Sequence, residues 1–383
     1  MRELLSNDPS GYAWGVLHER TPRIIAQTRD TYPYDPGRRR ALDALLTEIT
    51  TDVARPLASA AHDAAQWNEW GVDYFGRPWA DLPFLWWESY FYRRLLGAVG
   101  FFTPGPWFGL DPFEPLKTAE LGDPALGTDL AALDESVRSP IAERGRSALL
   151  ASLWGNRADL GFRVGQSPGN WQQGELVVAD DSAELWAALA GDTSRPVHFV
   201  ADNAGRELLS DLVLIDHLLS TGLVATLTLH LKPRPYYISD ATTADVMAGL
   251  RRLAAAGGES GRISLRLRDE LVDGRLALYT HPFYCAPWSY HHMPEDLADE
   301  FESASITIIK GDLNYRRLVG DLSWPPGTPF QEASAYFPGP VAALRTLKSD
   351  VLTGITPDHL ELLDRGGTSW RTDGTHAVIQ VRA

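Results

Sequence analysis

Acidic and amide side chains stand where an apolar run ends in the second half of the chain. The stretch PVHFVADNAGRELLSDLVLIDHLL, residues 196–219, passes from apolar residues into Asp202 and Asn203, and a helical pattern begins directly afterwards. Such polar groups are costly to bury without a partner. Asp and Asn also serve as caps and turn formers after strands. The pair alone therefore leaves two interpretations open, a cap or a pair of ligands for a cation.

A further oxygen donor follows the next predicted strand. The segment PRPYYISDAT contributes Asp240. Carboxylate and amide oxygens are ligands that Mg²⁺ and Mn²⁺ accept more readily than zinc does. The two carboxylates of Asp202 and Asp240, together with the neutral amide of Asn203, would cancel the charge of one divalent cation. The sequence therefore predicts a metal centre neutral enough to accept a phosphate.

Basic residues suited to an anion lie further along the chain. KGDLNYRRL contains Lys310 and Arg316 at a predicted helix start, where backbone N–H groups favour anions. LRTLKSD contains Arg345 and Lys348, whose spacing puts them on one face if that segment is helical. A solvated helix face is the alternative for Arg345 and Lys348, whereas the apolar residues before Lys310 indicate burial.

Other residues attract attention but match no reactive pattern. His281, His291 and His292 fit neither HExxH nor a paired Cys/His spacing, so we expect them to pack in a loop or in the core. Cys285 is expected to be a buried thiol. Tryptophan could stack on a sugar, but core filling is the expectation for Trp79, Trp86, Trp87 and Trp107. The sequence has no GxGxxG, P-loop or GxSxG motif, which argues against dinucleotide, P-loop and serine-hydrolase sites.

The elements that must position these residues fall into two groups. Residues 1–150 show helical periodicity, as in FLWWESYFYRRLLGAVGFF, and predict a helical lobe. In residues 151–383, strands alternate with helices, which predicts a Rossmann-like three-layer α/β/α domain with a mostly parallel sheet. Ligands of such sheets lie beyond the carboxyl ends of the strands, so the polar residues after successive strands should converge. The expected strands lie within residues 196–202, 223–232, 304–312, 333–339 and 376–383.

Composition limits the classes of partner. The chain has 383 residues and a formal charge of −15, which argues against nucleic acid and anionic membranes but not against a small anionic ligand. A single cysteine excludes an internal disulfide. The N-terminus lacks the apolar core of a signal peptide, and no apolar run approaches the roughly 20 residues that cross a bilayer. These features predict a cytoplasmic protein; the oligomeric state stays open.

Several motifs occur together in a recognisable order. They are LWGNRADL at 153–160, DNAGRELLSD at 202–211, SDAT at 239–242, KGDLNYR at 310–316 and RTLK at 345–348. Together they resemble the damage-control phosphatase family, known also as acidic-residue methyltransferase-like proteins and formerly as a domain of unknown function. RTLK resembles the Arg-Thr-x-Lys signature of the stand-alone subfamily. HERTPRI at 18–24 and FLWWESYFYRR at 84–94 extend the resemblance into the helical half.

The resemblance implies a metal-dependent phosphatase for monoesters of sugars or damaged metabolites, with substrates such as fructose 1-phosphate or fructose 6-phosphate. It implies that Asp202, Asn203 and Asp240 bind Mn²⁺, Co²⁺, Ni²⁺ or Mg²⁺. It further implies that Glu207, which matches the acid linked to methyl-donor binding in the family, lies near the site. The residues implied to hold the sugar phosphate are Asp312, Leu313, Asn314, Tyr315, Arg316 and Lys348.

The leading hypothesis is metal-assisted transfer of the phosphoryl group to water. The catalytic residues would be Asp202, Asn203, Asp240 and Lys348, with Arg316 and Lys310 also neutralising the phosphoryl oxygens. Water is favoured as the nucleophile over Asp202, because a coordinating carboxylate attacks poorly. Two alternatives are S-adenosylmethionine-dependent methylation of protein carboxylates and a sugar-phosphate-binding protein without catalysis.

Overall fold

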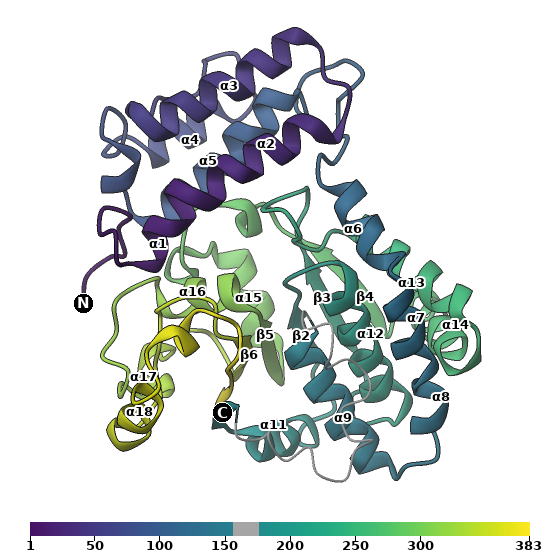
Figure 1. Cartoon of the computed structure of the whole chain (residues 1–383). Coiled ribbons are helices and arrows are strands. Elements are labelled where there is room, and N and C mark those ends of the chain that lie inside the picture. Colours follow the sequence, from purple (N-terminus) through teal and green to yellow (C-terminus); the bar gives the residue numbers. More distant parts are fainter. Residues whose placement is uncertain (156–175) are drawn as a thin grey trace.

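A seven-stranded sheet forms the centre of the computed structural model, which describes residues 1–155 and 176–383 (Figure 1). Its strand order is β1-β7-β6-β5-β2-β3-β4. Strands β2 to β6 run parallel, β7 is antiparallel to β6, and β1 is parallel to β7. The strands are β1 Val177–Asp180, β2 Val197–Val200, β3 Leu227–Leu231, β4 Leu276–Thr280, β5 Ile306–Lys310, β6 Val341–Thr346 and β7 Ala377–Arg382.

Alternate strand residues face two helical layers, which confirms the predicted α/β/α fold. On β2, Phe199 joins the core under one layer and Val200 joins the core under the other. The first layer contains α9 (Ile141–Trp154), α12 (Gly205–Ser220), α13 (Thr243–Ala256) and α14 (Gly258–Val272). The second contains α15 (Glu295–Ser303), α16 (Asp312–Val319) and α17 (Phe330–Ala333).

The order of the strands places a topological switch point between β2 and β5. From β2 the chain continues through α12 to β3, whereas from β5 it continues through α16 on the opposite face to β6. Because the two crossovers leave on opposite faces, a crevice opens beyond the carboxyl ends of β2 and β5.

The predicted strand at 333–339 is wrong. Residue 333 ends α17, and the residues after it form turns. The Ser334 hydroxyl donates to the carbonyl oxygen of Phe330, which continues the helical turn, and Phe337 packs into the core. Alternating apolar residues here therefore mark one buried side of a helical turn rather than a strand.

The N-terminal residues form the predicted helices and a lobe that lies above the sheet in Figure 1. Its core is aromatic and includes Trp79, Trp86 and Trp87. Helices α6 (Glu114–Leu121), α7 (Pro124–Ala131) and α8 (Leu133–Ser136) then pack against the first layer of the α/β domain. The lobe consists of α1 (Tyr12–Gly15), a π-helical turn (Val16–Arg20), α2 (Thr21–Thr31), α3 (Pro36–Thr51), α4 (Ala64–Trp70) and α5 (Phe84–Val99).

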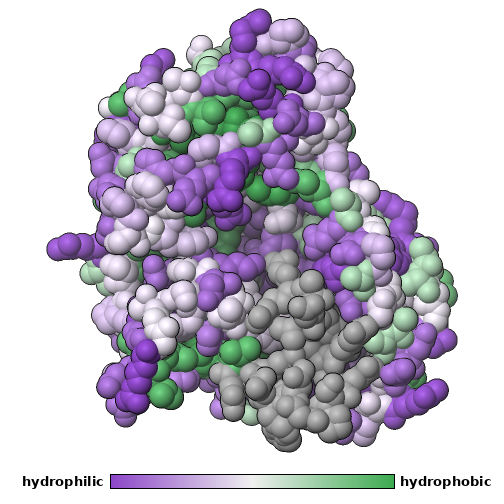
Figure 2. Space-filling model, in the orientation of Figure 1, coloured by the Kyte–Doolittle hydropathy of each residue, from purple (hydrophilic) through white to green (hydrophobic). Residues whose placement is uncertain are grey.

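The lobe packs on the loops that follow the strands. Tyr236, Tyr237, Cys285 and Leu313, all beyond strand ends, belong to the aromatic core of the lobe. Figure 2 shows the surface recessed between the lobe and the α/β domain. The carboxyl ends of the strands therefore face the helical lobe. Within residues 1–155 and 176–383, no helix has both the length and the apolar character to cross a membrane.

Candidate active site

The structure brings the exits of β2 and β3 together through their main chains. Asn203 and Asp240 pair as an antiparallel bridge. The Ala241 N–H donates to the carbonyl oxygen of Asp202 over 2.8 Å, and the Ala204 N–H donates to that of Ser239 over 2.6 Å. These backbone bonds hold three predicted metal ligands, Asp202, Asn203 and Asp240, at one place beyond the strands.

Side-chain hydrogen bonds orient this cluster. The Asn203 Nδ2 group donates to Asp202 Oδ2 over 2.8 Å and to Glu207 Oε2 over 2.9 Å. Asn203 Oδ1 accepts from the Ser239 hydroxyl over 2.6 Å. The amide therefore bridges two carboxylates, one following β2 and one on the first turn of α12.

Several carboxylates of this cluster are buried close to one another. Asp202 is buried, and burial together with the nearby carboxylates of Glu207 and Asp240 raises its pKa well above the usual value. Burial raises the pKa of Asp240 to about 6, against the opposing charge of Lys232. Buried carboxylates that oppose each other's ionisation need a cation nearby.

One oxygen of this cluster has no hydrogen bond among the residues that the structure describes. It is the buried Asp240 Oδ2, which lies 3.4 Å from the ammonium of Lys232. Among the described residues, no three Asp, Glu, His or Cys side chains form a metal-binding group by themselves. The carboxylates of Asp202 and Asp240 and the amide of Asn203 are hard oxygen donors, the type of ligand that Mn²⁺ and Mg²⁺ accept.

The turn from β5 into α16 forms the other wall of the crevice. Gly311 precedes α16 with a φ of 85°, and a Cβ placed on it would lie 2.0 Å from Asp202 Oδ2. Gly311 therefore gives both the backbone conformation and the space for the Asp202 carboxylate. The first helical bond of α16 runs from the Tyr315 N–H to the Gly311 carbonyl, so the N–H groups of residues 312–314 have no partner within the helix.

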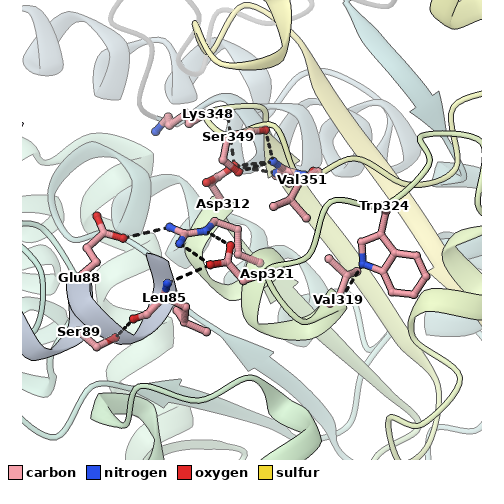
Figure 3. Close-up of polar contacts among 12 residues, drawn as sticks. Leu85, Glu88, Ser89, Asp312, Val319, Asp321, Trp324, Lys348, Ser349 and Val351 are labelled. Carbon is pink, nitrogen blue, oxygen red and sulfur yellow. Dashed lines mark hydrogen bonds and ion pairs between the residues drawn. The ribbon is translucent and has the colours of Figure 1, made fainter. Parts of the chain in front are cut away.

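Asp312 connects α16 to the loop after β6. Its carboxylate accepts bonds from Arg345 Nε at 2.8 Å, the Lys348 N–H at 3.2 Å and the Ser349 hydroxyl at 3.0 Å (Figure 3). The guanidinium groups of Arg345 and Arg316 hold the pKa of Asp312 below its usual value, despite burial. Asp312 thus fixes the backbone that carries Lys348.

Lys348 is partly exposed, unlike the other basic residues that the sequence predicts for the site. It is half-buried, and its charge opposes the rise in the pKa of Asp202. Within the described part of the chain its ammonium has no hydrogen bond or ion pair. Arg345 lies on β6, so the two residues do not share a helix face, and Arg345 is buried rather than solvated. A helical interpretation of LRTLKSD is wrong, because residues 344–346 end β6 and residues 347–350 form the loop after it.

Two other predicted cations are engaged by carboxylates. Lys310 is 1% exposed, and its Nζ lies 3.4 Å from Glu207 Oε1 and 3.3 Å from Asp211 Oδ1. Arg316 donates to Glu88 Oε2 over 3.1 Å and to both oxygens of Asp321. In this structure Lys310 and Arg316 are therefore counter-ions of buried carboxylates.

The remaining residues of the 312–316 segment face the protein interior. Leu313 packs into the core of the lobe. Asn314 donates to the carbonyl oxygens of Ala201 and Lys310 and so braces the ends of β2 and β5. The Tyr315 hydroxyl donates to Gln380 Oε1 over 2.9 Å, which joins α16 to β7.

Sequence reasoning missed two buried lysines beside Asp240. Lys232 is the counter-ion described above. Lys117 of α6 donates to the Asp240 carbonyl oxygen over 3.1 Å and to Asp245 Oδ2 over 3.0 Å. Lys232 carried the same signal as Lys310, a lysine that ends an apolar strand, whereas nothing local distinguishes Lys117 from a surface lysine.

The lobe contributes a further acid that the sequence analysis did not single out. Glu88 of α5 is buried, receives a bond from the Tyr237 hydroxyl over 3.2 Å, and pairs with Arg316 (Figure 3). Burial raises the pKa of Glu88, while Arg316 and Arg20 oppose the rise. The sequence signal for Glu88 was an acidic residue within the aromatic-rich stretch FLWWESYFYRR.

The residues expected to be structural are structural. Cys285 is buried. His281 accepts a bond from the Phe283 N–H, and His291 stacks on Tyr336 with ring centroids 3.5 Å apart. Trp79, Trp86 and Trp87 are buried and Trp107 is partly buried in the lobe. Residues 156–160 of the motif LWGNRADL lie outside the described residues.

Known proteins are similar to this chain over most of its length. The family model of the damage-control phosphatase ARMT1-like domain matches residues 16–363. Damage-control phosphatase ARMT1 of Danio rerio is 29% identical, with 96% of this chain and 94% of that protein covered. The Mus musculus protein of the same name is also 29% identical, with 98% and 97% covered. A solved DUF89 family protein from Pyrococcus horikoshii is 15% identical, with a TM-score of 0.49 over 92% of this chain and 94% of that one.

The match is not confined to one lobe. Residues 16–363 include the helical lobe, the ends of β2, β3 and β5, and the loop that carries Lys348. The chain therefore belongs to the damage-control phosphatase ARMT1-like family.

Proposed function

We propose that the protein is a metal-dependent phosphatase that hydrolyses phosphate monoesters of sugars or damaged metabolites, such as fructose 1-phosphate or fructose 6-phosphate. The observation that carries this proposal is the buried pair Asp202 and Asp240, in which burial raises the pKa of both carboxyls and the charge of Lys348 acts on Asp202. Asp202, Asn203 and Asp240 would hold Mn²⁺, Co²⁺, Ni²⁺ or Mg²⁺. When bound, such an ion polarises a phosphoryl oxygen and offsets its charge.

The residues of the chain itself divide the remaining work. The N–H groups of residues 312–314 and the ammonium of Lys348 would bind the phosphoryl oxygens. Asp312 and Arg345 hold the Lys348 loop in position. Lys310 neutralises Glu207, which keeps the Asn203 amide in place. The helical lobe covers the crevice and limits the access of bulk water.

Water is the preferred nucleophile in this arrangement. Asp202 Oδ2 accepts a bond from Asn203 and lies against Gly311, so this carboxylate oxygen is not free to approach phosphorus. In-line attack requires the water and the leaving group to lie on opposite sides of phosphorus, and in this proposal the leaving group is directed away from the strands.

The test combines metal binding with hydrolysis. Mn²⁺ at 100 times its Kd should stabilise the wild type by about 2.7 kcal/mol in thermal melts. Asp202→Asn and Asp240→Asn should lose that stabilisation and lower hydrolysis of fructose 1-phosphate and p-nitrophenyl phosphate by roughly a thousandfold or more. Asp192→Asn, which changes an exposed carboxylate bonded to Ser194, should behave as the wild type.

Two results would contradict the proposal. Hydrolysis that persists in both site variants would remove the metal centre from the mechanism, and so would full activity after chelation. Calorimetric binding of S-adenosylmethionine with methyl transfer, or sugar-phosphate binding without release of phosphate, would favour the two alternative functions instead.

A further inference from the structure

Arg20 stands at the end of an unusual turn in the helical lobe. Residues 16–20 form a π-helical turn in which the Thr21 N–H and hydroxyl both bond to the Val16 carbonyl oxygen. Pro22 follows, and because it lacks an N–H it cannot donate the α-helical bond to residue 18. Such π-turns are rare and occur frequently at functional sites. The turn changes the direction in which Arg20 projects relative to a regular helix.

Arg20 is an exposed residue whose side chain, among the described residues, has no hydrogen bond or ion pair. Three other arginines of the lobe are paired, whereas Arg40 of α3, which is also exposed, has no such partner among the described residues. Arg38 pairs with Asp35, Arg93 with Asp63, and Arg94 with Glu48. An arginine that is held by a rare turn but not paired is available to a ligand.

The surroundings of Arg20 lie on the lobe side of the crevice. Its charge acts on Tyr12, Glu88, Tyr92 and Tyr237, three of which are buried. The Tyr12 phenol is also within electrostatic range of Asp312, and the Tyr92 phenol within range of Asp240. Arg20 is therefore close to side chains at the contact between the lobe and the α/β domain, where Tyr92 and Tyr237 share one core and Glu88 pairs with Arg316 of α16.

The chain between β3 and Asp240 connects the two walls. Tyr92 of α5 stacks on Tyr237 with ring centroids 4.5 Å apart. Tyr237 has a φ of 56°, which a non-glycine residue rarely adopts, and its hydroxyl bonds to Glu88. Asp240 follows three residues later. The phosphate-binding groups belong to the α/β domain, so a leaving group directed away from the strands meets the lobe wall that contains Arg20.

We propose that Arg20 is a specificity-determining residue that donates hydrogen bonds to the oxygen atoms of the leaving group. This inference rests on the proposed phosphatase function. The guanidinium offers five N–H donors and no acceptor, so it matches the hydroxyl and carbonyl oxygens of a sugar phosphate. An aryl leaving group offers no such oxygens next to the ester. A site built around an unpaired donor discriminates against ligands that leave the donor unpaired.

The test measures binding and turnover with matched probes. Calorimetry on the Mn²⁺-loaded protein would compare fructose 1-phosphate with inorganic phosphate, and kinetics would compare fructose 1-phosphate with p-nitrophenyl phosphate. Arg20→Met should weaken fructose 1-phosphate binding at least tenfold more than phosphate binding. It should lower kcat/KM for fructose 1-phosphate at least tenfold more than for p-nitrophenyl phosphate.

Two further variants separate recognition from folding. Arg23→Met removes an exposed arginine of α2 whose Nε bonds to the Glu19 carbonyl, and it should leave both ratios as in the wild type. Arg20→Lys keeps one donor and the charge, and it should recover part of the lost fructose 1-phosphate affinity at an unchanged melting temperature.

Equal losses for fructose 1-phosphate and phosphate would overturn the inference, because Arg20 would then serve the phosphate itself. Unchanged binding in Arg20→Met, or no binding of fructose 1-phosphate to the wild type, would also overturn it. If the wild type hydrolyses no ester, the proposed function fails. A selective tenfold loss of sugar-phosphate binding in Arg20→Met would still support the role of Arg20.

Discussion

The carboxylate of Asp202 lies directly against the backbone of Gly311. The two residues follow β2 and β5, which are neighbours in the sheet, and a Cβ on Gly311 would lie 2.0 Å from Asp202 Oδ2. No L side chain fits at that distance. The acid after one strand and the glycine after the next are therefore parts of one packed unit at the switch point of the sheet.

Gly311→Ala should remove activity and destabilise the protein by about 2–5 kcal/mol, because the new methyl group displaces Asp202 and the residue keeps a positive φ. Urea unfolding and hydrolysis of p-nitrophenyl phosphate would measure the two effects. Gly222→Ala is the matched control, since Gly222 has a φ of 71° but no atom within 4 Å of an added Cβ. It should cost about 1–2 kcal/mol and leave hydrolysis intact; equal activity in both variants would contradict the packing argument.

Asp312→Asn should lower kcat/KM by roughly a hundredfold. The substitution removes the charge that holds Arg345 and weakens the bonds to the Lys348 N–H and the Ser349 hydroxyl, so the loop that carries Lys348 loosens. Mn²⁺ binding should persist, because the metal ligands are untouched. Asp373→Asn alters a comparable acceptor for Thr375 on the surface and should leave the kinetics as they are.

Glu88→Gln should destabilise the protein by about 3–5 kcal/mol, since it leaves Arg316 buried with half of its charge compensation lost. The pair joins the lobe to α16, so chemical denaturation followed by tryptophan fluorescence would report the loss. Glu361→Gln breaks an exposed pair with Arg365 and should change stability by less than about 0.5 kcal/mol. A small effect of Glu88→Gln would show that the two lobes associate without this ion pair.

The buried pair His198 and His230 predicts acid sensitivity. Their ring nitrogens Nδ1 and Nε2 lie 2.6 Å apart, and burial lowers the pKa of His198 to about 4. The unfolded chain binds a proton below about pH 6.5, whereas the folded protein does not until about pH 4. The stability contributed by neutral His198 is therefore complete above pH 6.5 and is lost as the pH falls through that window.

Urea unfolding at pH 7.0 and pH 4.5 would measure this effect. His198→Gln should lose about 2 kcal/mol less stability between the two pH values than the wild type does. His359→Gln, at a half-buried position on α18 (Pro357–Asp364), should show the wild-type loss. An equal loss in His198→Gln would assign the acid sensitivity to other groups.

Local patterns in the sequence predicted the α/β fold class but not strands β1, β4 and β6. Alternation of strand and helix patterns from residue 195 onwards predicted a mostly parallel sheet, because only crossover connections join parallel strands. The same rule predicted that residues after strand ends would meet, and the structure brings Asp202, Asn203 and Asp240 together. The strand expected at 333–339 failed because apolar alternation over a short span also fits a buried helical turn.

Only the tertiary structure decided which charges are engaged and which are available. Sequence reasoning expected Lys310, Arg316, Arg345 and Lys348 all to serve a phosphate ligand, yet the first three are paired with carboxylates and Lys348 is not, among the described residues. Those partners include Glu88, more than two hundred positions away from Arg316. Charge compensation depends on distance in space, which local periodicity does not encode, so the residue types determined the chemistry and the packing of the two lobes determined where it is used.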